Sequence, residues 1–117
     1  MKMEKMKTIL YIDHSESWKV LIQEELSEEG YRVVTASSTE EALSELDRIH
    51  PDLIILELRQ KRFIKENFEN LKKKYPDIPW IGYSTFYQCP NEYKKWIDHY
   101  LQKLPQTNGI KNLIKEL

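Results

Sequence analysis

Short, almost continuous apolar runs recur along the chain and predict buried strands. The runs at residues 8–12 and 53–56 show no alternation of apolar and polar positions, which is typical of strands covered on both faces in a parallel sheet. Residues 32–36 are rich in β-branched side chains, and shorter apolar runs follow at 80–83 and 100–101. We therefore expect five strands.

Between these runs, apolar residues return at intervals of three and four, which is the spacing of one face of an α-helix. The first helical segment stops next to Gly30, a residue type that commonly ends helices. The second begins with Ser38 and Glu41 in a capping-box pattern and has Leu46 in its apolar stripe, as the third has Ile64. The predicted helices cover 15–29, 38–50, 64–75, 91–98 and 107–117.

Strict alternation of strands and helices predicts the fold class. Strand–helix–strand units connect by right-handed crossovers, which bring parallel strands together and place helices over the sheet. We expect an α/β fold with a five-stranded parallel sheet and helices on both faces. Ligands of such sheets bind outside the carboxyl ends of the strands, so the residues that follow each strand are the candidate functional residues.

Composition narrows the class of protein further. The chain has 117 residues, a size typical of one domain, and its 18 Lys and Arg against 19 Asp and Glu give a net charge of −1. No net positive field is present to hold a nucleic acid or an anionic membrane. The one cysteine, Cys89, suits a reducing compartment, and the apolar run behind the basic N-terminus is too short for a signal peptide or a membrane span. We expect a cytoplasmic protein.

Polar residues stand at or just past the ends of four of the predicted strands. Asp13 and His14 follow the first strand, Glu57 the third, Ser84 the fourth and Lys103 the fifth. This set resembles the receiver domain of two-component response regulators, the CheY-like superfamily. That family has an acidic pair, a phosphoacceptor Asp, a Thr or Ser and a Lys at these four places. The apolar run from Pro51 into Glu57 and the Tyr100 that stands three residues before Lys103 also resemble family motifs.

The resemblance covers residues 8–117. It implies the flavodoxin-like (βα)5 receiver fold, one receiver-like domain over 1–117 with its core in 8–117, and no output domain.

Two substitutions separate the chain from the family pattern. Glu57 stands where the phosphoacceptor Asp is expected, and its extra methylene moves the carboxylate by roughly 1–1.5 Å. His14 replaces the second acid, which the family uses as a Mg²⁺ ligand. We expect inefficient phosphorylation, no cofactor, and at most weak Mg²⁺ binding at Asp13 and Glu57. A zinc site on Asp13, His14 and Glu57 is a weaker hypothesis, because no fourth ligand accompanies the three.

Two interpretations of Glu57 beside Lys103 stay open. In the first, the Glu57 carboxylate stands in for an acyl phosphate and keeps the receiver permanently in an active-like state. In the second, Asp13, Glu57 and Lys103 form a structural charge cluster in a pocket that no longer switches.

The resemblance also implies a relay and an output surface. Ser84 and Tyr100 would be the switch hydroxyl and the switch aromatic residue. The surface of the fourth helix, fifth strand and fifth helix is the family's usual output and dimer face, and Tyr93, Trp96 and His99 gather there as candidate interface residues. Expected partners are a histidine kinase, a phosphotransfer protein, a transcription factor or a second copy of the chain, with no nucleic acid and no membrane.

The sequence therefore predicts a stand-alone, receiver-like signalling module that acts by protein contact without phosphorylation and is not an enzyme. One alternative is a working phosphoacceptor with an atypical site. A remote alternative is a small flavodoxin-like binder of nucleotide or flavin, which would need a glycine-rich phosphate loop. The three glycines, Gly30, Gly82 and Gly109, are scattered.

Overall fold

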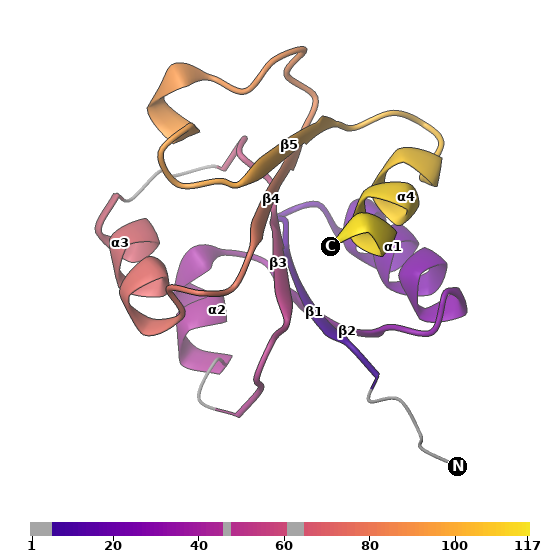
Figure 1. Ribbon diagram of the computed structural model, residues 1–117, viewed down its shortest axis with the longest axis horizontal. Coiled ribbons are helices and arrows are strands. Elements are labelled where there is room, and N and C mark those ends of the chain that lie inside the picture. The colour runs from indigo at the N-terminus through magenta and orange to yellow at the C-terminus, as the bar shows by residue number, and fades with distance from the viewer. Residues whose placement is uncertain (1–5, 46–47, 61–64) are drawn as a thin grey trace.

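The chain folds as a parallel sheet with helices on both faces (Figure 1), in a computed structural model that describes residues 6–45, 48–60 and 65–117. All strand pairs are parallel, and the sheet order is β2-β1-β3-β4-β5. The predicted fold class is confirmed. The elements are β1 (Thr8–Ile12), α1 (Glu16–Glu28), β2 (Arg32–Ala36), α2 (Thr39–Glu45), β3 (Leu53–Leu56), α3 (Lys65–Lys74), β4 (Trp80–Ser84), the 3₁₀ turn η1 (Asn91–Tyr93), β5 (His99–Gln102) and α4 (Asn108–Glu116).

Successive residues of the central strands alternate between two apolar layers. Leu10 and Ile12 of β1 pack toward α2 and α3, and Ile9 and Tyr11 pack toward α1 and α4. Figure 1 shows these two helix pairs on opposite sides of the sheet. Every residue of β1, β3 and β4 is buried, because side chains cover both faces of these strands. This explains why their sequences show no alternation.

The helix expected over 91–98 is wrong. Only Asn91–Tyr93 is helical, and it is a 3₁₀ turn. The amide hydrogen bonds of Tyr93, Lys94 and Trp96 each reach back three residues, to Pro90, Asn91 and Tyr93. Tyr93 and Trp96 are three positions apart, a spacing that suits the three-residue period of a 3₁₀ turn as well as an α-helix. The structure therefore has four α-helices in its described residues, where five were expected.

The capping box of α2 is half confirmed. The Glu41 amide donates to Ser38 Oγ at 3.1 Å, as expected, but the Glu41 carboxylate accepts from the Ser37 amide, one residue earlier than predicted. Leu46 and Ile64, assigned to the apolar stripes of two helices, lie outside the described residues. Within 6–45, 48–60 and 65–117, every helix is too short or too polar to cross a bilayer.

Gly82 lets β4 approach the residues that precede and enter β5. A Cβ at this position would lie 2.7 Å from Ile97 Cδ1, 3.2 Å from a ring carbon of Tyr100 and 3.3 Å from Leu58 Cδ1. A side chain here would therefore push against three neighbours at once, one of them the expected switch residue.

We predict that Gly82→Ala lowers the free energy of unfolding by about 1–3 kcal/mol, because it overpacks this contact. Gly109→Ala is the matched control, since its Cβ would come no closer than 3.4 Å to Leu101, and alanine favours a helix. Urea unfolding of both variants measures the difference. Equal stability of the two variants would contradict the prediction.

Candidate functional site

Three charged side chains meet at the carboxyl end of the sheet. Lys103 Nζ lies 2.6 Å from Asp13 Oδ2 and 3.3 Å from Glu57 Oε1. The exposed fractions of the Lys103, Asp13 and Glu57 side chains are only 3%, 1% and 6%. The structure thus brings together residues that are 46 and 90 positions apart in the sequence. Their strands end at the same edge of the sheet, which is why the sequence could predict the cluster.

Backbone hydrogen bonds fix the position of each of the three residues. The amide of Asp13 donates to Ala36, that of Glu57 to Ile12 and that of Lys103 to Ser84. These bonds continue the parallel ladder one step past the strands. The charged side chains therefore start from rigid backbone and not from free loops.

Both oxygens of the Asp13 carboxylate accept hydrogen bonds. Oδ2 accepts from the Tyr11 hydroxyl at 2.6 Å as well as from Lys103, and Oδ1 accepts from the Ser15 amide at 2.9 Å. Burial, and then the hydrogen bond to Asp13, raise the pKa of the Tyr11 hydroxyl far above its usual range. Tyr11 therefore remains a neutral donor to the carboxylate.

Two polar atoms of the site have no hydrogen-bond partner among the described residues: Glu57 Oε2 and Ser84 Oγ. Both residues are buried, at 4% and 0% exposure. The Ser84 hydroxyl therefore does not donate to the Glu57 carboxylate, although one carboxylate oxygen is available. An unmade hydrogen bond at a buried group is unfavourable, so this pair is the least satisfied part of the site.

The side chains at the site offer few free oxygen atoms to a Mg²⁺ ion, which is consistent with weak binding at most. Mg²⁺ requires near-octahedral oxygen ligands. Here Asp13 is bonded to three donors, Glu57 shares the Lys103 ammonium, and His14 is exposed with its Nδ1 3.9 Å from Asp13 Oδ1. Across the described parts of the chain, no three His, Cys, Asp or Glu side chains are grouped to hold a metal. The zinc hypothesis therefore receives no support.

Tyr100 is tied to the loop that follows β4. Its hydroxyl lies 3.1 Å from the Ser84 carbonyl oxygen and also donates to the Phe86 carbonyl. From the other side, Arg59 Nε donates to Thr85 Oγ1 at 2.7 Å, and the guanidinium carbon lies 3.9 Å from the centroid of the Phe86 ring. These contacts hold the start of the loop in one arrangement.

The candidate interface residues divide into buried and exposed groups. Tyr93 and Trp96 are each 8% exposed and pack on Phe68, with ring centroids 6.3 Å and 6.0 Å away. They are core residues, and little of either ring can reach a partner. His99 is exposed and Tyr100 is half-buried, so an interface role for these two stays a prediction.

Sequence reasoning missed Tyr11 and Trp18 as members of the site. Trp18 is half-buried, and its ring centroid lies 4.7 Å from Lys103 Nζ and 5.9 Å from the Tyr83 ring centroid. A signal for Tyr11 existed: it is two residues before Asp13, so the pleat places both side chains on one face of β1. No comparable pattern marks Trp18, because its contact depends on how α1 packs.

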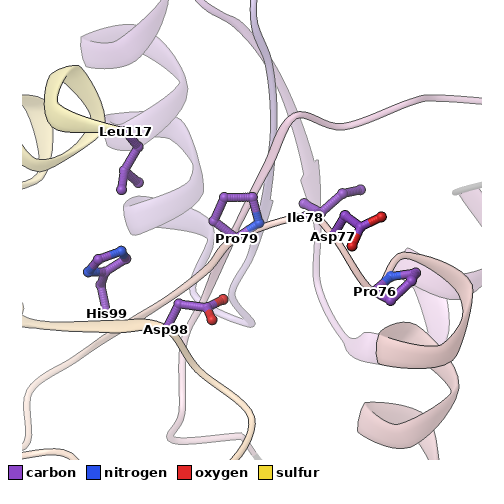
Figure 2. A pocket seen from close by; sticks show the side chains of 7 residues that line it. All are labelled: Pro76, Asp77, Ile78, Pro79, Asp98, His99 and Leu117. Atoms are coloured by element: carbon purple, nitrogen blue, oxygen red, sulfur yellow. The ribbon is translucent and has the colours of Figure 1, made fainter.

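A separate pocket of about 340 Å³ lies at the opposite end of the sheet from the charged cluster, where β4 and β5 begin (Figure 2). Asp98 and His99 line it beside Pro79 and Leu117. The Asp98 carboxylate accepts from the Trp80 amide at 2.8 Å and lies 3.6 Å from Lys72 Nζ. Asp98 therefore links the start of β4 to Lys72 of α3. The pocket is remote from the charged cluster.

The curated proteins that are similar to this chain include two transcriptional regulators. No protein-family model matches the chain. The chain is 46% identical over 52 residues to the alkaline phosphatase synthesis transcriptional regulatory protein PhoP of Bacillus subtilis, a match covering 44% of the chain and 22% of PhoP. It is 37% identical over 73 residues to the probable transcriptional regulator ycf27 of Porphyridium aerugineum, covering 62% of the chain and 30% of that protein. The matches span less than a third of either relative.

Solved structures match over nearly the whole chain. The response regulator TrrA of Thermotoga maritima, crystallised with the histidine kinase ThkA, matches with a TM-score of 0.81 and 30% identity, over 95% of this chain and 97% of the other. TrrA in complex with Mg²⁺ and beryllofluoride gives a TM-score of 0.80 and 29% identity, over 95% and 98%. The chemotaxis protein CheY4 of Vibrio cholerae, at 21% identity over 96% and 98%, has the same fold with a TM-score of 0.84.

We predict that tyrosines at the site ionise late on alkaline titration. Burial raises the pKa of Tyr83 to about 12, and burial followed by the Glu57 charge raises that of Tyr100 to about 12. Because these values lie above the unfolded value of about 10, the stability they contribute is complete below about pH 10 and is lost as the pH rises through 12. Tyrosinate absorbance should therefore appear at higher pH in the native chain than in denaturant.

Tyr100→Phe should remove one late-ionising group and lower stability by about 1 kcal/mol, the usual contribution of a hydrogen bond. Tyr87→Phe is the control, because its side chain is 82% exposed. If the two variants lose equal stability, the Tyr100 hydroxyl does not stabilise the loop after β4.

Proposed function

The chain belongs to the receiver domains of two-component response regulators, and we propose that it acts in such a pathway without being phosphorylated, through protein contact. Receiver domains are signalling modules and not enzymes as a class. The observation that carries the proposal is the Lys103 ammonium, which binds Asp13 and Glu57 at once in a buried cluster.

The chemistry of phosphoryl transfer supports this proposal. The reaction needs a reachable nucleophile in line with the donor and a cation that neutralises the phosphoryl oxygens. Glu57 is 4% exposed, is one methylene longer than Asp, and has one oxygen bonded to Lys103. A misplacement of this size costs about a hundredfold in rate. The poor fit of the site to Mg²⁺ removes the usual counter-ion as well.

The contacts around Glu57 favour a fixed arrangement over a permanent active-like state. In the active-like hypothesis, Glu57 would engage both Lys103 and the Ser84 hydroxyl. Lys103 is engaged at 3.3 Å, but Ser84 Oγ has no partner among the described residues, and Tyr100 is tied to backbone carbonyls. We infer that the site now holds the ends of β1, β3 and β5 in place.

Protein surfaces then carry the signal. Partners of the expected classes are a histidine kinase, a phosphotransfer protein or a transcription factor, and TrrA, a solved relative, was crystallised with the histidine kinase ThkA. A homodimer through the face of η1, β5 and α4 is a further proposal. That face lacks a full helix before β5, so its shape differs from the helix–strand–helix surface that the sequence predicts.

Treatment with acetyl phosphate and Mg²⁺ tests the proposal. We expect no mass gain of one phosphoryl group in the intact chain, because Glu57 is buried and paired. A receiver domain that keeps its phosphoacceptor Asp is the positive control under the same conditions. A phosphoryl group on Glu57 would establish the working-phosphoacceptor alternative instead.

The Glu57→Gln variant separates the two interpretations of the carboxylate. Partners captured from the source cytoplasm by the parent chain should bind the variant equally well if the site is a fixed structural cluster. Loss of those partners in the variant, with the fold intact by circular dichroism, would support the active-like interpretation.

A further inference from the structure

We propose that Tyr11 and Trp18 close the receiver pocket independently of the Glu57 and His14 substitutions. This inference rests on the proposed function and names the side chains that keep phosphodonor and cation out. Neither residue is one of the acids, the hydroxyl, the lysine or the switch aromatic residue to which the resemblance gives a role. Restoring the two missing acids alone would therefore leave the pocket closed.

Tyr11 closes the site from the interior of the fold, where it occupies one acceptor position of Asp13. Its side chain is fully buried in the layer under α1 and α4, and its hydroxyl donates to Asp13 Oδ2 at 2.6 Å. The same oxygen accepts from Lys103, and the other oxygen accepts from the Ser15 amide. A cation that binds Asp13 would have to compete with these donors for the carboxylate oxygens.

Trp18 covers Lys103 from the side of α1. The Lys103 ammonium lies 4.7 Å from the Trp18 ring centroid and 5.8 Å from that of Tyr83, both within the range of cation–π attraction. The Trp18 and Tyr83 rings meet edge to face with an interplanar angle of 89°. The ammonium is thus enclosed by two carboxylates and two aromatic rings.

The position of Lys103 in the fold does not by itself explain its burial. It follows β5, the edge strand, in which no residue is fully buried. Its side chain is nevertheless 3% exposed. The Ser15 hydroxyl accepts from the Trp18 amide at 3.3 Å, and the Ser15 amide donates to Asp13, so the start of α1 holds Trp18 and Asp13 together. Trp18 is therefore a positioned cover and not a loose surface ring.

A restoration series tests the proposal. The first variant combines His14→Asp with Glu57→Asp, and the second adds Tyr11→Phe and Trp18→Ala. With acetyl phosphate and Mg²⁺, we expect the second variant to gain a phosphoryl group about tenfold faster or more, since freeing one charged hydrogen bond is worth at least that factor. Mg²⁺ affinity, measured by titration, should rise in parallel.

The matched control adds Tyr87→Phe and Val20→Ala to the two restored acids. These positions are 82% and 51% exposed, so the control should behave like the first variant. The proposal is overturned if the first variant reacts as fast as the second, or if the second variant, folded by circular dichroism, reacts no faster than the control.

Amine labelling provides a second test that does not depend on restored chemistry. In the parent chain, a water-soluble acylating reagent should modify Lys103 at least about tenfold more slowly than the exposed Lys94, because a buried amine reacts only on local opening. Trp18→Ala should remove most of this protection and leave Lys94 unchanged. Equal labelling of the two lysines in the parent would overturn the proposal that Trp18 covers Lys103. Phosphorylation of the parent would refute the proposed function but would leave this labelling result standing.

Discussion

One buried ammonium group, that of Lys103, holds the carboxyl edge of the sheet together. It neutralises two carboxylates, on Asp13 and Glu57, whose side chains are only 1% and 6% exposed. Buried charges are tolerated only when they are paired and hydrogen-bonded, so both carboxylates depend on this ammonium group. The two carboxylates and one ammonium leave a surplus negative charge, which the Tyr11 hydroxyl and the Ser15 amide stabilise by donating to Asp13.

The proposal that this receiver domain acts without phosphorylation draws on the surroundings of this contact. Trp18 covers the ammonium, and Tyr100 is tied to the carbonyls at the start of the loop after β4. In a switching receiver the same region must rearrange when a phosphoryl group arrives. Here the Ser84 hydroxyl does not contact Glu57, so the carboxylate has no direct route to Tyr100 through that side chain. In the proposed function the site keeps one arrangement, and the outer surface of the chain carries the signal.

The sequence predicted most of the fold and the centre of the site, but less of its surroundings. Continuous apolar runs are typical of strands buried on both faces, and parallel strands bring Asp13, Glu57 and Lys103 to the same end of the sheet. The helix over 91–98 failed because Tyr93 and Trp96 are three residues apart, which fits a 3₁₀ turn equally well. Their burial against Phe68, and the contact of Trp18 with Lys103, arise from the packing of distant segments, which local patterns do not encode.

The free energies of unfolding of Lys103→Met and Glu57→Gln test the role of the ammonium most directly. Lys103→Met leaves two buried carboxylates without a counter-ion and should lower stability by about 3–5 kcal/mol at neutral pH. Glu57→Gln removes the surplus charge and leaves the pair of Lys103 and Asp13 intact, so its cost should stay below about 2 kcal/mol. Denaturant unfolding of both variants beside the parent gives the comparison. A loss from Lys103→Met no larger than that from Glu57→Gln would contradict the account.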